Sequence, residues 1–421
     1  AITLGATGDS INLASGATQS GFGRTGTVDW DTTPKTATFT AVNGTGYFCN
    51  TTAGAFNITL PISPTAGDIV ALKDYNGTFA TNNLTIDRNS SKLNGSSSNF
   101  ALSTNFTSMT LVYVDSTEGW MPVEEGTGFI GENFVIGTGG TITTCGNCKV
   151  HTFTGPGTFT VSQVADCSSD NVVSYIVVAG GGGGGANRGG GGGAGGFRED
   201  KSPVTPYTAS PLDGAGAITV SAQGYPITVG GGAAPTPSGR GVAGSNSVFS
   251  TITSTGGAGG GSASSVPIGP GNNGGSGGGA AGPGTGGTGN TPPVSPSQGN
   301  NGGDGIGGPA FAASGGGGAS CGGTSGSPSS GGAGGAGATT SITGSPVQYA
   351  GGGGGSTNGL PAGAAGAGGG GAGVAPGNNG GNATANTGGG GGGGGGNGPG
   401  GSDNDGGAGG SGIVIIRYKF Q

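Results

Sequence analysis

The sequence predicts an all-β protein in which small β modules precede a sandwich of polyglycine II helices bracketed by β-strands, with almost no α-helix. Helical periodicity is nearly absent, whereas short alternating or β-branched stretches bounded by Gly, Asn, Ser and Pro recur along the chain. Of the 113 glycines, 91 lie from Gly180 onward, in runs as long as the nine residues of Gly388–Gly396. These observations together indicate a β protein with an ordered glycine-rich part.

The glycine runs can be read as a flexible, disordered tail or as packed helices. Gly-rich sequence is usually flexible, but here the runs end in the most apolar strand of the chain, Gly412–Tyr418, which needs a partner. Glycine makes a poor α-helix but can form a helix with three residues per turn. Without Cβ atoms, such helices can hydrogen-bond laterally through their backbones. Collagen is excluded because strict Gly-X-Y spacing is absent and proline is sparse.

Composition divides the chain into four expected parts. Residues 1–40 form an N-terminal attachment segment, residues 41–125 a β-rich module, residues 126–144 a connector and residues 145–421 a glycine-rich distal domain. Trp120 is expected to anchor the core of the β-rich module. The candidate strands of that module are Gly46–Asn50, Phe56–Leu60, Asp68–Asp74, Asn83–Asp87, Ser108–Tyr113 and Gly119–Val123.

The distal domain is expected to have strands at both ends of its glycine runs. Lys149–Thr154, Thr158–Val161 and Val172–Ala179 open it, and Gly412–Phe420 closes it. The simplest geometry pairs Tyr175–Val178 with Ile413–Ile416. Tyr225–Val229 and Ser247–Thr253 are further candidate strands. Expected loops rich in Asn, Ser, Thr and Pro cover residues 197–224, 262–314, 322–350, 356–367 and 376–387.

Charge is scarce and unevenly placed. Charged residues make up 7% of the chain, the net charge is −7, and no Lys or Arg lies between Arg240 and Arg417. A basic patch for nucleic acid is therefore not expected. No segment reaches the roughly 18 apolar residues of a membrane span, so membrane insertion is not expected either. The first residues, Ala1–Leu4, lack the basic and apolar regions of a signal peptide.

The cysteines leave three states open. Five cysteines, an odd number, argue against a secreted disulfide framework. Cys145, Cys148 and His151 have partial zinc-ligand spacing, and Cys167 could complete four ligands. A zinc site, a local disulfide and free thiols all fit this pattern. Since no second Cys pair stands at zinc-ribbon spacing, we expect no metal and no cofactor.

Catalysis is not expected. The single histidine, His151, lies in an apparent strand, so any triad would depend on that one residue. The carboxylate pairs Glu124–Glu125 and Glu199–Asp200 are adjacent in sequence, and adjacent side chains on an extended chain point to opposite faces. Asp403–Gly406 could contribute to a calcium site but lacks the glutamate at loop position twelve. We therefore expect a protein that is not an enzyme.

Several segments resemble bacteriophage proteins. Phe56–Pro61, Lys73–Ile86 and Gly119–Trp120 resemble a β module common in phage tail fibres, and Tyr175–Gly180 with Gly412–Tyr418 resembles the glycine-rich fibre domain. The likeness is greatest to tail fibres and receptor-binding proteins of phages of marine bacteria. It implies a homotrimer in the virion, made in the host cytoplasm and joined to other tail proteins at its N-terminus. It also implies a polyglycine sandwich whose loops contact the host.

The candidate contact residues are large side chains set among small ones. Loops on a rigid scaffold concentrate recognition residues, and amide- and hydroxyl-rich loops suit hydrogen bonding to sugars. The alternative is that these large side chains are packing plugs between glycine runs. The candidates are Ile268, Phe311, Tyr349, Leu360 and Val374.

The expected function is that of a tail-fibre adhesin. Its partner would be a host cell-surface receptor, either a polysaccharide or an outer-membrane protein. Two other classes stay open. Flat, uncharged glycine faces would suit an ice-binding protein, and a bacterial surface or matrix structural protein is the third possibility.

Overall fold

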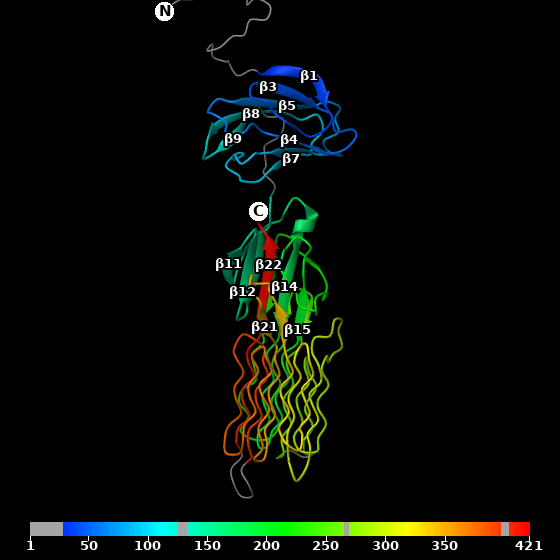
Figure 1. Ribbon diagram of the computed structural model, residues 1–421, viewed down its shortest axis with the longest axis vertical. Helices are drawn as coiled ribbons and strands as arrows, with labels where there is room; N and C mark the ends of the chain where they lie inside the picture. The colour runs from blue at the N-terminus through cyan, green and yellow to red at the C-terminus, as the bar shows by residue number, and fades with distance from the viewer. Residues whose placement is uncertain (1–27, 125–132, 265–268, 397–403) are drawn as a thin grey trace, which may run out of the picture. The chain divides into compact units, whose positions relative to one another are not determined.

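The chain folds into two units that are almost entirely β. The computed structural model describes residues 28–124, 133–264, 269–396 and 404–421. One unit spans Ala1–Glu132 and the other Asn133–Gln421 (Figure 1). The one helical turn of the described part is the 3₁₀ segment η1 (Ser168–Asn171), which confirms the all-β class. In the same residues no helix is long and apolar enough to cross a membrane.

The described part of the first unit contains two sheets. In each sheet three neighbouring strands run parallel. These strands are β1, β3 and β5 in one sheet and β2, β4 and β6 in the other. The first sheet has the order β1 (Asp29–Lys35), β3 (Thr45–Cys49), β5 (Ile69–Asp74), β8 (Ser108–Asp115) and β9 (Gly119–Glu124). The second has the order β2 (Phe39–Thr40), β4 (Phe56–Thr59), β6 (Leu84–Asp87) and β7 (Phe100–Leu102).

Side chains from both sheets share one core. Trp120 is fully buried there and meets Tyr113 edge-on with 5.7 Å between ring centroids, as its expected anchoring role requires. The expected boundary at residue 40 differs from the structure, because β1 and β2 belong to these sheets. They are held by parallel ladder bonds to β3 and β4, a long-range pairing that local composition does not reveal. Residues 1–27 of the expected attachment segment lie outside the described residues.

Two larger sheets and a small hairpin make up the strands of the second unit in its described residues. The expected connector, residues 126–144, contributes β10 and most of β11 to them, so its described part is not a linker. One sheet has the order β10 (Ile136–Thr138), β13 (Gly157–Gln163), β17 (Gly224–Thr228), β18 (Ser247–Phe249) and β19 (Ile252–Ser254). The other contains β11 (Thr141–Cys145), β12 (Cys148–Phe153), β22 (Ile413–Lys419), β14 (Val172–Val178) and β15 (Phe197–Asp200), with β16 (Ile218–Thr219) beside β14. The hairpin is β20 (Ala338–Thr340) with β21 (Val347–Tyr349).

The expected pairing of the two ends of the glycine-rich region is confirmed. β14 and β22 are antiparallel neighbours, with Tyr175 opposite Ile416 and Val178 opposite Ile413. Both strands are buried on their two faces. Tyr175 and Val177 enter one core cluster, whereas Ile176 and Val178 enter the cluster on the opposite face. This double burial explains the continuous apolar runs of both strands, because neither face needs a polar residue.

Extended glycine-rich segments run from these strands to a far end of the unit, turn, and come back (Figure 1). We call them the glycine helices, and the turns distant from the strands the far-end turns. The first helix continues β14, and the second returns into β15. The glycine helices cover residues 179–187, 189–196, 230–236, 240–246, 255–262, 269–274, 275–281, 284–290, 299–305, 312–319, 321–326, 331–337, 350–357, 363–368, 370–375, 379–384, 388–396 and 404–411.

Hydrogen bonds between glycine helices repeat every third residue, which is the pattern of a helix with three residues per turn. In helix 179–187, Gly180 and Gly183 donate to one neighbour, and Gly181 and Gly184 donate to another. A third neighbour takes the remaining bonds, and three further helices donate back to this one. The six neighbouring segments are residues 239–245, 404–410, 190–196, 257–260, 233 and 391–394. Bonded main chain therefore forms the interior of this part of the protein.

Glycine is required inside this bundle because the helices approach backbone to backbone. A Cβ added to Gly184 would overlap the carbonyl group of Gly392, and one added to Gly191 would overlap that of Gly353. Residues 179–186 and 189–197 are buried throughout. A side chain added at Gly184 or Gly191 would separate two helices and break their shared hydrogen bonds.

Outer helices carry Asn and Asp at intervals of three. Asn301 and Asp304 accept hydrogen bonds from the backbone N–H groups of Gly289 and Gly286, at 2.9 and 2.8 Å. Residues 379 and 382 do the same for residues 405 and 408, at 3.0 and 2.9 Å. These side chains replace carbonyl acceptors that a helix at the edge of the bundle lacks.

The prediction of long loops at residues 262–314 and 322–350 is wrong. Most described residues of the first segment form glycine helices, whereas the second contains two glycine helices and the hairpin of β20 and β21, joined by turns. The reason is that an outer helix tolerates Thr, Asn, Ser or Ala at each position that faces solvent. Such a helix therefore looks like a polar loop in the sequence.

Candidate functional site

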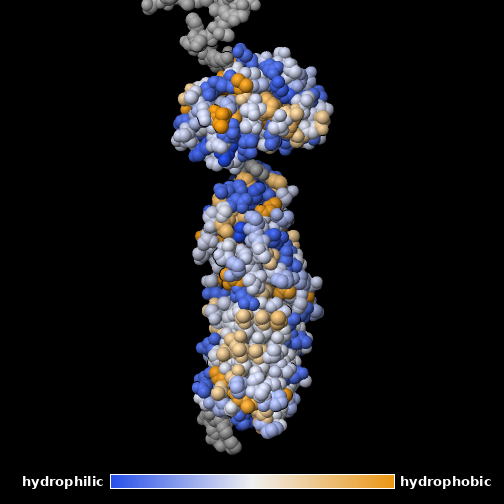
Figure 2. Space-filling model, viewed as in Figure 1, coloured by the Kyte–Doolittle hydropathy of each residue, from blue (hydrophilic) through white to orange (hydrophobic). Residues whose placement is uncertain are grey.

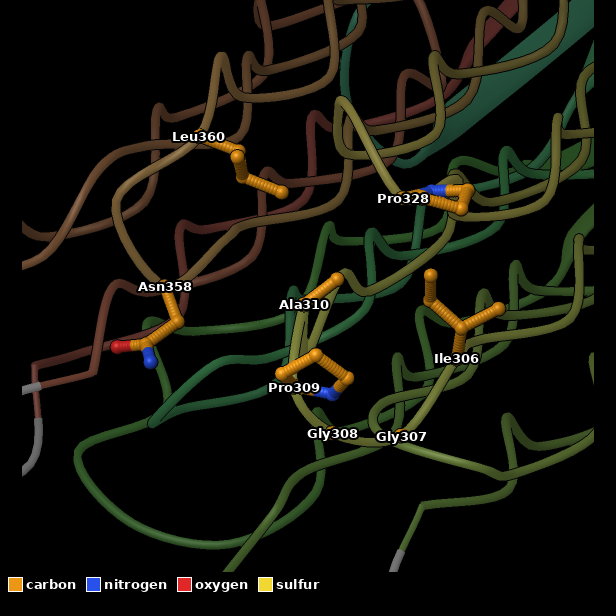
Figure 3. A pocket seen from close by; sticks show the side chains of 8 residues that line it. All are labelled: Ile306, Gly307, Gly308, Pro309, Ala310, Pro328, Asn358 and Leu360. Atoms are coloured by element: carbon orange, nitrogen blue, oxygen red, sulfur yellow. The ribbon is translucent and has the colours of Figure 1, made fainter.

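A surface hollow of the second unit lies at its far-end turns. Three of these turns, residues 306–311, 327–330 and 358–361, enclose a hollow of about 440 Å³. In Figure 3, Ile306 and Pro328 lie on one side of the Pro309–Ala310 segment, and Leu360 and Asn358 lie on the other. The lining residues are Ile306, Gly307, Gly308, Pro309, Ala310, Pro328, Asn358 and Leu360.

Each turn is fixed by its own hydrogen bonds. The Ile306 N–H donates to the Ala312 carbonyl at 3.0 Å, and the Phe311 N–H donates to Gly307 at 3.1 Å. Ser327 and Ser330 close the second turn through a backbone bond of 2.9 Å. In the third turn the Thr357 hydroxyl donates to the carbonyl of Leu360. Since each turn is anchored to glycine helices at both ends, the hollow is held by the bundle beneath it.

Next to the hollow, an aromatic ring and a guanidinium group are paired. Phe311 is 37% exposed, and its ring packs against Gly308, whose added Cβ would lie 3.0 Å from the ring. The ring centroid also lies 5.3 Å from the guanidinium carbon of Arg188. Arg188 belongs to the turn between helices 179–187 and 189–196, so it lies where two of the innermost helices end. The pair places a cation and an aromatic face beside the apolar hollow.

The chemistry of the hollow is apolar with one amide. Ile306, Pro309, Pro328 and Leu360 provide apolar surface, and Asn358 provides the only polar side chain among the lining residues. None of the lining side chains ionises. In Figure 2 the glycine helices show a mostly pale surface, as their few charges lead one to expect, with small orange areas near their far ends. The hollow therefore suits an uncharged group that offers apolar surface and a hydrogen-bonding partner for an amide.

The five expected contact residues have different positions. Leu360 lines the hollow and Phe311 adjoins it, so the structure brings these two together. Tyr349 is 5% exposed and packs in a core cluster beneath β22, so the packing alternative applies to it and surface contact does not. Val374 is half-buried on helix 370–375, where its carbonyl accepts the N–H of Thr357. Ile268 lies outside the described residues.

The weak zinc candidates Cys145, Cys148, His151 and Cys167 are not brought together as a metal site. In the described residues no group of three His, Cys, Asp or Glu side chains could hold a metal ion. Both ring nitrogens of His151 have other partners, since Nδ1 lies 2.7 Å from the Gly139 carbonyl and Nε2 lies 3.1 Å from the Tyr418 hydroxyl. Burial lowers the pKa of His151, which favours the neutral ring. Cys145 and Cys148 face each other across a hairpin and Cys167 is exposed, and all three are free thiols.

Sequence reasoning missed Ile306, Pro309, Pro328 and Asn358. A signal was present at each, because a far-end turn interrupts the small residues of a glycine helix with Pro or a bulky side chain. Gly-Gly-Pro-Ala-Phe at 307–311 and Asn-Gly-Leu-Pro at 358–361 are such interruptions. Composition alone could not show that these turns meet, because the segments that carry them are about 50 residues apart.

Comparison with known protein families agrees with this architecture. Residues 152–419 match the family described as a glycine-rich domain. The chain belongs to this glycine-rich domain family. The matched region begins in β12 and ends at the last residue of β22, so the glycine-rich domain includes the strands that bracket the glycine helices. No curated protein matches the chain significantly.

Proposed function

We propose that the protein is a bacteriophage tail-fibre or receptor-binding adhesin whose glycine-rich domain contacts the host surface through its far-end turns. The observation that carries the proposal is the hollow formed by three turns at the end of a hydrogen-bonded bundle. A rigid scaffold that ends in variable turns is a common arrangement for recognition. The likeness of Phe56–Pro61 and Lys73–Ile86 to phage fibre modules supports the same proposal.

The chemistry of the site defines the kind of receptor. An apolar hollow with one amide, beside a stacked Phe311–Arg188 pair, suits a polysaccharide or an exposed loop of an outer-membrane protein. Each site would bind modestly, and several fibres acting together would supply avidity. In this proposal the protein is a homotrimer in the virion, and its N-terminal segment joins it to other tail proteins.

Immunogold electron microscopy on the native source tests the proposal. The antibody is raised against residues 262–350, which include two of the three turns around the hollow. Gold at the free ends of fibres on phage tails is the expected result. Gold on cell envelopes or on free filaments, with phage tails unlabelled, would refute the phage assignment and favour a structural protein. Thermal hysteresis of a cooled solution would favour ice binding instead.

A further inference from the structure

The asparagine of the hollow is followed by glycine, and this pair is chemically unprotected. Asn358 and Gly359 are both exposed. Within the described residues, neither the Asn358 side chain nor the Gly359 N–H makes a hydrogen bond. A Cβ added to Gly359 would have no atom within 4 Å, so nothing crowds the backbone there. The Asn358 amide can therefore approach the following backbone nitrogen freely.

The other Asn-Gly pairs of the described residues are protected. In every one of them the glycine N–H is a hydrogen-bond donor, so its nitrogen is held away from the preceding side chain. In several, the asparagine oxygen is also bound, as in Asn273, which accepts the Thr288 N–H at 2.7 Å, and in Asn301. The N–H of Gly77 donates to the Asp74 carboxylate at 3.0 Å, and the other glycine N–H groups donate to backbone carbonyls. These bonds are Gly44 to Ile69 (2.7 Å), Gly95 to Glu118 (2.8 Å), Gly274 to Thr288 (3.2 Å), Gly302 to Gly287 (2.9 Å) and Gly380 to Asp405 (2.8 Å).

We propose that Asn358 is a site of spontaneous deamidation, which converts the only polar side chain lining the hollow into a carboxylate. The Gly359 nitrogen attacks Cγ of Asn358, so that an N–Cγ bond forms and the Cγ–Nδ2 bond breaks. Ammonia leaves and carries away the proton of the Gly359 N–H. Water then opens the resulting succinimide at either carbonyl, which gives aspartate or isoaspartate. The reaction needs no other reagent, and glycine favours it because no side chain blocks the attack.

The modification would change the recognition surface, and this consequence rests on the proposed function. The hollow lacks an ionisable lining group before the reaction. Afterwards a carboxylate would have to lose water when an uncharged ligand entered, which disfavours binding. Isoaspartate also adds one backbone atom to the turn that carries Leu360. The hollow would thus lose affinity as the protein ages.

Peptide mapping of the aged full-length protein tests the assignment. The protein is held in warm, mildly alkaline buffer and digested with a protease of broad specificity, because trypsin finds no site between Arg240 and Arg417. Mass spectrometry then follows the amide-to-acid conversion at Asn358 and, as internal controls, at Asn301 and Asn273. In each control pair two hydrogen bonds must break before the glycine nitrogen can attack. Breaking them costs about 2 kcal/mol, so conversion at the controls should be roughly 30-fold slower than at Asn358. Conversion at Asn358 no faster than at the controls would overturn the proposal, whatever the protein binds.

Two variants separate the chemistry from its consequence. Asn358→Gln keeps an amide but forms the cyclic intermediate far less readily, so aging should leave position 358 unchanged. Asn358→Asp reproduces one product from the start and should bind host cells more weakly than Asn358→Gln. Equal binding of both variants would refute the effect on recognition. A total lack of cell binding by unaged wild-type protein would instead count against the proposed function.

Discussion

Replacing one inner glycine by alanine should destabilise the glycine-rich domain strongly. In Gly191→Ala, the new Cβ would overlap the carbonyl of Gly353, so helices 189–196 and 350–357 must separate locally. Three hydrogen bonds join these two helices and the neighbouring helix 312–319 around this contact. Gly191 donates to Ser314 at 3.0 Å, Gly353 donates to Gly192 at 2.9 Å, and Gly316 donates to the displaced Gly353 carbonyl at 2.9 Å.

The expected loss follows from these bonds. At about 1 kcal/mol for each, the three bonds contribute roughly 3 kcal/mol, and overpacking adds about 1–2 kcal/mol. The free energy of unfolding should therefore fall by about 4–5 kcal/mol, which lowers the Tm by roughly 10 °C. Thermal unfolding, followed by calorimetry on the full chain, measures this change.

Gly231→Ala is the matched control. Gly231 is exposed on helix 230–236, and an added Cβ would have no atom within 4 Å. The alanine should leave stability unchanged or raise it by up to about 1 kcal/mol, because it restricts the unfolded chain. If Gly191→Ala and Gly231→Ala unfold within about 0.5 kcal/mol of each other, the backbone-packed interior is refuted.

Two further predictions concern stability. Asn301→Ala should lower the free energy of unfolding by about 1 kcal/mol, because the Gly289 N–H loses its acceptor, whereas Thr285→Ala on a neighbouring outer helix should change it by less than about 0.5 kcal/mol. Equal losses in denaturant titrations would contradict the edge-acceptor role. The pKa of buried His151 is lowered, so the unfolded chain binds a proton more readily than the folded chain. The contribution of His151 to the free energy of unfolding should therefore be fully present above pH about 6.5. It should decrease as the pH falls towards the pKa of His151 in the folded chain. His151→Gln should flatten this part of the pH profile, and an unchanged slope would contradict the assignment.

The sequence predicts the ends of the glycine-rich domain better than its middle. Tyr175–Val178 and Ile413–Ile416 could be paired in advance because their apolar runs are unbroken, which is typical of a strand buried on both faces. The glycine helices among the described residues of 262–314 could not be recognised, because side chains that face solvent are free to vary. The period of three in Asn301 and Asp304 is visible only once their acceptor role is known.

Part of the candidate site was predictable because large side chains are conspicuous in a glycine-rich sequence. Phe311 and Leu360 stand out as large side chains among glycines, and both reach the far-end turns. Tyr349 stands out equally but fills the core beneath β22, where β21 ends and a glycine helix begins. A large side chain in the glycine-rich sequence therefore either packs in the core near the strands, as Tyr349 does, or lies at a far-end turn, as Phe311 and Leu360 do. Which of the two positions such a side chain takes depends on whether its segment joins a glycine helix to a strand or joins two glycine helices at the far end.

The most direct test of the recognition site is competition for host adsorption. Cells that the phage carrying this protein infects are first incubated with full-length protein, and adsorption of the phage is then counted. Wild-type protein should block adsorption. Leu360→Asp, which places a charge in the hollow, should not block it, whereas Thr288→Asp on the side of an outer helix should block it as wild type does. Equal blocking by Leu360→Asp and wild-type protein, with both folded, would contradict recognition through the hollow.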